Sequence, residues 1–167
     1  MRRLLLAILL LCPIACSADD WGAIQYLVGN WTGEGGGVPG QGAGAFSFQP
    51  DLHGKILVRK SRAEYPATKD RPAFEHDDLM IVYRELDDRA EGAPRAIFFD
   101  NEDHVIRYDI TMFGDRIIFT SEAVHDNPQY RLTYTRVTAD TLRIKFEIAL
   151  PGKGFTTYLD ASAKRAK

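Results

Sequence analysis

The sequence LRIKFEI at residues 142–148 alternates apolar and charged side chains without interruption. A period of two places successive side chains on opposite faces of an extended chain, so this segment predicts a β-strand with one dry and one wet face. The segment YRLTYT at residues 130–135 alternates in the same way, and residues 137–140 have the length of a hairpin connection. Together the two segments predict an antiparallel pair of strands.

Similar short segments cover the chain on the N-terminal side of this pair, and turn sequences separate them. Residues 101–103 (NED) and 113–115 (FGD) provide two further hairpin turns. Strands are expected at residues 30–35, 45–49, 56–65, 79–84, 96–100, 104–110, 117–119, 130–135, 142–148 and 155–160, with a short helix at residues 20–27.

About ten strands joined mostly by short connections indicate an all-β fold. Consecutive strands pair most simply with each other, and a sheet of about ten strands is near the size at which twisted sheets curl or close. The sequence therefore predicts a single antiparallel up-and-down barrel of about ten strands with a short N-terminal helix. A flattened sandwich of two sheets is the alternative.

The first eighteen residues differ in kind from the rest. Arg2 and Arg3 precede an unbroken apolar run at residues 4–11, and small residues follow it. This is the pattern of a bacterial export signal, and the run is shorter than the roughly 20 apolar residues that a bilayer span needs. We expect a signal peptide at residues 1–18, cleaved after Ala18, and one lipocalin-like domain at residues 19–167 that is periplasmic or secreted.

Cys16 offers an alternative to simple cleavage. Ile14 and Ala15 before it resemble a lipobox, in which the cysteine carries lipid and becomes the first residue, although Pro13 stands where the pattern prefers leucine. The sequence thus leaves open a lipoprotein anchored through Cys16. The only other cysteine, Cys12, also lies in this segment, so the expected mature domain has no disulfide and no thiolate site.

Charge argues against a nucleic-acid partner. The formal net charge of the 167 residues is −2, and loss of Arg2 and Arg3 with the signal peptide changes it to −4. Nucleic-acid binding relies on an excess of Lys and Arg that neutralises phosphates. Hydrophobic residues make up 45% of the chain, enough to form a core.

The sequence GNWTGEG at residues 29–35 resembles the GxWxGxG opening of nitrobindin-type, haem-binding β-barrels. More broadly it is similar to the calycin group, which includes lipocalins and fatty-acid-binding proteins, and to exported bacterial barrels of lipocalin-like type. The resemblance implies a barrel with an interior ligand site. On physical grounds, Trp31 can plug one end of a barrel, while Gly33 and Gly35 let the first strand bend.

The resemblance to nitrobindins also implies an axial histidine on one of the last strands. The last histidine of this chain is His125, and Tyr130, Tyr134 and Tyr158 are more typical of cross-strand packing than of iron ligation. The carboxylate clamp that a fatty-acid-binding protein implies lacks its arginine next to Tyr158. Haem is therefore not expected, and the cofactor is left unknown.

The first functional hypothesis is a binding protein, rather than an enzyme, that holds a small apolar or amphipathic molecule inside the barrel. Inward aliphatic and aromatic side chains would line the site. By alternation the candidates are Trp31, Phe46, Phe48, Ile81, Tyr83, Phe98, Tyr108, Phe119, Tyr134, Phe146 and Tyr158. The alternative is a structural barrel that these side chains fill completely, leaving no room for a ligand.

A second hypothesis places a metal site or an enzyme at the barrel rim. His76 and Asp78 precede one expected strand, and Asp100 and His104 flank a turn between two others. If these turns share a rim, imidazole and carboxylate groups could bind a divalent cation or act as an acid–base pair. No HExxH-type spacing links them, and acids at strand ends are usually solubilising residues.

Charged residues in the third expected strand leave its inner face ambiguous. Arg59, Arg62 and Glu64 follow an apolar run at residues 56–58 that fits either face. A buried arginine requires a charged partner and could form an anion-binding pocket. The pattern favours solvated side chains for all three.

Overall fold

A computed structural model describes residues 21–34, 43–70, 72–85 and 92–167. The expected signal peptide, the lipid-anchor candidate Cys16 and Gly35 lie outside the described residues. The strands are β1 (Gly29–Glu34), β2 (Ala43–Asp51), β3 (Ile56–Tyr65), β4 (Phe74–Arg84), β5 (Pro94–Asp100), β6 (Val105–Phe113), β7 (Arg116–Ser121), β8 (Gln129–Arg136), β9 (Thr141–Ala149) and β10 (Thr156–Arg165). Two short 3₁₀ helices, η1 (Gly22–Leu27) and η2 (Leu52–Gly54), accompany them.

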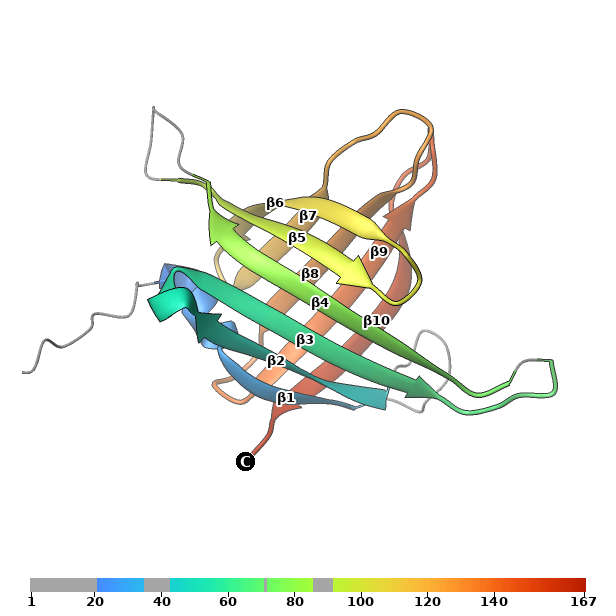
Figure 1. The fold of residues 1–167 in the computed structure, drawn as a ribbon, viewed down its shortest axis with the longest axis horizontal. Coiled ribbons are helices and arrows are strands. Elements are labelled where there is room, and N and C mark those ends of the chain that lie inside the picture. The colour runs from blue at the N-terminus through green and yellow to red at the C-terminus, as the bar shows by residue number, and fades with distance from the viewer. Residues whose placement is uncertain (1–20, 35–42, 71, 86–91) are drawn as a thin grey trace, which may run out of the picture.

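The strands form a closed barrel in which each strand pairs antiparallel with its neighbours in sequence (Figure 1). Closure is made between β1 and β10, where Trp31 lies opposite Arg165. This confirms the all-β up-and-down barrel and rules out the two-sheet sandwich. The expected N-terminal helix is present as the 3₁₀ helix η1. No helix among the described residues is long and apolar enough to cross a bilayer.

Most strands are longer than their apolar patterns predicted, and β4 and β10 extend furthest beyond the expected ends. β4 begins at Phe74, five positions before the expected start at Leu79, and β10 continues to Arg165, beyond Asp160. The added residues of β4 continue its antiparallel pairing with β3. Phe74 accordingly lies opposite Tyr65 of β3, and the two rings stack with their centroids 4.4 Å apart.

Helix η1 and the residues around it seal one end of the barrel (Figure 1). Ile24 and Leu27 are buried, and the Trp31 indole nitrogen donates to the Leu27 carbonyl at 2.8 Å. The Arg165 guanidinium lies 4.2 Å from the Trp31 ring centroid and donates to the Val28 carbonyl. Trp31 therefore plugs this end, as the sequence predicted.

Candidate functional site

The other end of the barrel contains an open cavity of about 510 Å³. Its lining comes from the strand ends farthest from η1, including Tyr65 of β3 and Phe74 of β4 at the mouth. Deeper aromatic walls are formed by Phe98 and Tyr108, which meet edge to face, and by Phe146. The barrel is therefore hollow at one end and sealed at the other.

The expected lining residues divide into three groups. Those that line the cavity are Phe46, Phe98, Tyr108, Phe146 and Tyr158. Those that fill the barrel between the cavity and η1, at 1% exposure or less, are Trp31, Phe48, Phe119 and Tyr134. The remaining two, Ile81 and Tyr83, do not line the cavity. The part of the interior next to η1 is therefore filled, as the alternative of a filled barrel supposed, and the part at the other end is not.

The prediction for the inner face of β4 was wrong: the residues that point inward are shifted by one position from those expected. Met80 and Val82 are fully buried, whereas Ile81 and Tyr83 alternate with them on the outer side and keep part of their surface exposed. The run at residues 79–83 is apolar throughout, so alternation gave no way to choose its inner face.

Tyr158 reaches the mouth of the cavity through an irregularity in β10. The register against β9 shifts between Thr157 and Leu159, which leaves Tyr158 as an extra residue. Bulges of this kind redirect a side chain locally. The Tyr158 ring meets Phe146 edge to face at 6.1 Å, although 57% of the tyrosine is exposed.

A buried ion pair lies at the inner end of the cavity. The Arg59 guanidinium of β3 contacts the Asp78 carboxylate of β4, and their side chains are only 11% and 7% exposed. Met80 is the register partner of Arg59, so Asp78 is its diagonal neighbour on the inner face. The solvated placement expected for Arg59 was therefore wrong.

Arg62 and Glu64, the other two β3 residues considered with Arg59, lie toward solvent, as expected. Arg62 and Glu64 occupy the opposite alternation to Arg59, and their side chains are 53% and 72% exposed. The Arg62 guanidinium pairs with Glu75 of β4 at 2.6 Å. Its charge is thus engaged at the outer edge of the barrel, whereas that of Arg59 is held inside.

Two polar atoms near this ion pair lack a hydrogen bond. Arg59 Nε and the Tyr134 hydroxyl are buried and have no partner of ordinary geometry among the described residues. Burial lowers the pKa of Arg59, but the Asp78 charge and the nearby Tyr134 outweigh it, so the pKa lies above its ordinary value. Burial also raises the pKa of Tyr134 and of Tyr108. Arg59 is therefore a permanent cation beside neutral phenols.

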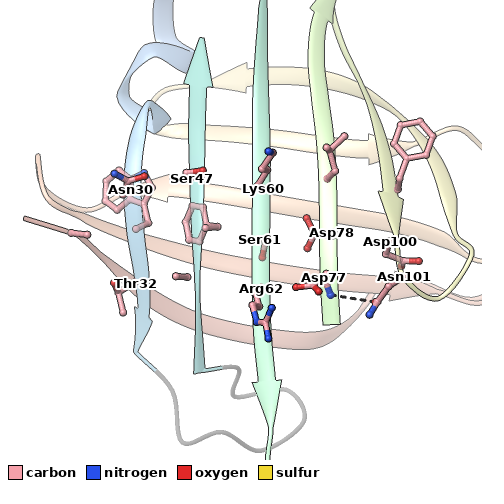
Figure 2. A pocket seen from close by; sticks show the side chains of 16 residues that line it. Asn30, Thr32, Ser47, Lys60, Ser61, Arg62, Asp77, Asp78, Asp100 and Asn101 are labelled. Atoms are coloured by element: carbon pink, nitrogen blue, oxygen red, sulfur yellow. Dashed lines mark hydrogen bonds between the residues drawn. The ribbon is translucent and has the colours of Figure 1, made fainter. Parts of the chain in front are cut away.

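The four residues of the rim hypothesis line this same cavity: His76, Asp78, Asp100 and His104. Asp78 and Asp100 are register partners on β4 and β5, and Figure 2 shows them on neighbouring strands next to Ser61 of β3. The His104 imidazole contacts the Asp100 carboxylate at 2.8 Å. The sequence predicted these four residues to be close only if their turns shared one rim, and in the structure they line one cavity.

Their hydrogen bonds are those of a structural turn. Asp100 also accepts from the backbone N–H groups of Glu102 and His104, at 2.9 and 3.0 Å. Burial raises the pKa of Asp100, but these hydrogen bonds outweigh it and hold the pKa below its ordinary value. No group of three or more His, Asp or Glu side chains within the described part of the chain is arranged to hold a metal ion.

A broad, shallow hollow lies along β1 to β5 and shares Asp78 and Asp100 with the cavity (Figure 2). Its other polar residues include Lys60 and Asp77. The Asn101 side chain accepts from the Asp77 backbone N–H at 3.2 Å, which ties the β5–β6 turn to β4. This surface is more open than the cavity and mixes polar with apolar side chains, whereas several aromatic rings wall the cavity.

The fold and the cavity define a closed ten-stranded up-and-down barrel with a one-ended interior site, an architecture consistent with a calycin-like barrel. No family model matches the chain, and a search of curated proteins finds no similar sequence.

The predictions from the sequence did not include the Arg59–Asp78 pair, nor several other lining residues such as Ser61 and Tyr130. A signal for the first was present. Residues 74, 76, 78, 80 and 82 share one alternation, so assigning the inner face of β4 correctly would have placed His76 and Asp78 inside. A buried Asp78 carboxylate then requires a cation, and Arg59 is the nearest candidate on the paired strand.

Proposed function

We propose that the protein binds a small amphipathic molecule in the cavity opposite η1. The observation that carries this proposal is the unfilled aromatic space of about 510 Å³ with a buried Arg59–Asp78 pair at its inner end. Ligand sites in proteins typically have about 300–1,000 Å³ and combine apolar walls with a few polar groups. The cavity fits this description in both size and composition.

The wall supports a ligand with an apolar body. Phe98, Tyr108, Tyr130 and Phe146 contribute aromatic surface, and Leu132 adds an aliphatic patch. Apolar surface in contact with water is unfavourable, and an apolar ligand that covers it gains free energy in proportion to the area removed from solvent. The ligand's polar group then lies toward Arg59, because this end of the cavity holds the buried charges.

The N-terminal residues support a role outside the cytoplasm. Arg2, Arg3 and the apolar run at residues 4–11 are expected to direct export, with cleavage after Ala18. Intact mass spectrometry of the protein made in a bacterial host with an export pathway tests this. A chain that begins at Asp19 is expected, a lipid-modified Cys16 at the terminus supports the anchored alternative, and a retained signal segment contradicts export processing.

Binding is tested with N-phenyl-1-naphthylamine, an uncharged probe whose fluorescence rises in apolar surroundings. We expect saturable enhancement with one probe per chain. Ala161 lines the cavity, so Ala161→Phe should fill it and weaken probe binding at least tenfold. The matched control is Thr111→Phe, which adds a ring to an exposed position of β6 outside the cavity. Equal binding by Ala161→Phe and the wild type contradicts the proposal.

A further inference from the structure

We propose that the cavity selects uncharged amphiphiles that carry a hydrogen-bond acceptor, and that Asp78 excludes carboxylates and other anions. This inference rests on the proposed function, because it names the ligand class of the same site. Two features of the cavity support this selectivity: the balance of charge around it and the set of hydrogen-bond donors at its inner end.

The charge balance inside the cavity is negative. Among the described residues that line it, the arginines are Arg59 and Arg62, and Arg62 is engaged with Glu75 at the outer edge. The Arg59 charge is already matched by Asp78. Asp100 adds a second carboxylate in register with Asp78; its side chain is only 4% exposed and contacts the His104 imidazole. Glu102 adds a third carboxylate to the lining, so acids outnumber arginines.

An anionic ligand therefore gains little from Arg59. Its carboxylate would approach a guanidinium that already has a counter-ion, and it would lie close to the like charge of Asp78. It would also lose its hydration on entering an aromatic cavity, a large cost for an ion that gains no unpaired partner. A neutral group avoids both the repulsion and most of the desolvation cost.

The unused hydrogen-bonding capacity at the inner end suits an acceptor. A guanidinium has five N–H donors and no acceptor, and Arg59 lines the cavity while its bond to Asp78 is made through Nη1. Ser61 and Tyr108 bring further hydroxyl groups to the cavity wall. A carbonyl or ester oxygen can accept hydrogen bonds from such donors without carrying charge into the site.

The test compares cis-parinaric acid with its methyl ester by fluorescence titration at pH 7.5. The two probes share a chain, and only the acid carries a charge at this pH. We expect the wild type to bind the ester at least tenfold more tightly than the acid. The comparison uses the unaltered protein, so it does not depend on whether a variant folds. Equal or tighter binding of the acid overturns the inference and leaves interior binding intact.

Two variants then test whether Asp78 causes the preference for the ester over the acid. Asp78→Asn removes the carboxylate that neutralises Arg59, and we expect the preference for the ester to fall to less than threefold, mainly through tighter binding of the acid. Asp77→Asn is the matched control, because Asp77 neighbours Asp78 in sequence but does not line the cavity. A preference that changes equally in both variants, or in neither, overturns the role of Asp78.

The uncharged naphthylamine probe separates this inference from the proposed function. If it binds while neither parinaric probe does, the inferred ligand class is wrong and interior binding stands. If none of the three probes binds, the proposed function fails and the inference fails with it.

Discussion

Arg59 and Asp78 form an ion pair between diagonal positions of β3 and β4 on the inner face of the barrel, where both side chains are largely shielded from solvent. The pair separates a packed half of the interior from a hollow half. Beyond it toward η1 the rings of Phe48 and Phe119 each pack edge to face with Tyr134. Toward the mouth the same barrel encloses the cavity.

Breaking this pair should destabilise the barrel. Asp78→Leu leaves the Arg59 charge buried without a partner, and removal of one member of a buried pair costs about 3–5 kcal/mol. The double variant Arg59→Met/Asp78→Leu should recover most of that loss, because neither charge of the pair then remains buried without its partner. Urea unfolding of the wild type and of both variants measures this difference. A double variant no more stable than the single one would contradict the pairing.

Arg165 should stabilise the sealed end. It lies over the Trp31 ring and donates hydrogen bonds to the carbonyls of Val28 and Tyr26 at 2.7 and 3.1 Å. Its replacement by alanine removes a cation–π contact and leaves two carbonyls without this donor, which should cost about 2 kcal/mol. Thermal unfolding checks this, with Lys153→Ala in an exposed turn as the control. Equal losses in the two variants would refute the assignment.

Glu147 should contribute to stability above acidic pH. Hydrogen bonds from Arg131 and Lys145, at 2.7 and 2.8 Å, outweigh the effect of burial and lower its pKa from 4.5 to about 2. Because the folded pKa lies below the unfolded one, this stabilisation is complete above about pH 4.5 and disappears as the pH falls toward 2. Glu147→Gln should flatten the pH dependence of the unfolding free energy in that range. Parallel curves for the two proteins would contradict the prediction.

Replacement of His104 distinguishes the hypothesis of a binding barrel from that of an enzyme with its site at the rim. Its contact with Asp100 organises the β5–β6 turn, and its side chain is half exposed. His104→Ala should lower the unfolding free energy by about 1 kcal/mol. Although the imidazole lines the cavity, binding of N-phenyl-1-naphthylamine should stay within twofold of the wild type, because an uncharged aromatic probe is held by the aromatic walls. Loss of probe binding in a folded His104→Ala protein would favour a functional role for the imidazole at the rim.

The sequence predicted architecture better than it predicted the site. Ten extended segments, the up-and-down order and the plug at Trp31 followed from local patterns, because alternation and turn residues act over a few positions. The inner face of β4 did not follow, since residues 79–83 are apolar on both sides. Its assignment requires the register between β3 and β4, in which Val82 lies opposite Leu57, and both of these residues are buried.

The buried charges of the interior could not be predicted from the sequence for the same reason. Charged residues mostly lie at the surface, so Arg59 and Asp78 were expected to be solvated until each could be seen as the other's partner. They are separated by 19 positions in the chain, and their contact depends on strand pairing. The bulge that places Tyr158 at the mouth is likewise a property of the β9–β10 pair and has no signature in β10 alone.

Interior binding is tested most directly by methyl NMR of the protein titrated with N-phenyl-1-naphthylamine. We predict that the methyl signals of Leu132, Ile144 and Ile148, which line the cavity, shift together and saturate at one equivalent of probe. Those of Leu57 and Val82, in the packed interior outside the cavity lining, should move much less. Shifts confined to the outer-surface residues Leu79 and Ile118, or no shifts at saturating probe, would contradict an interior binding site.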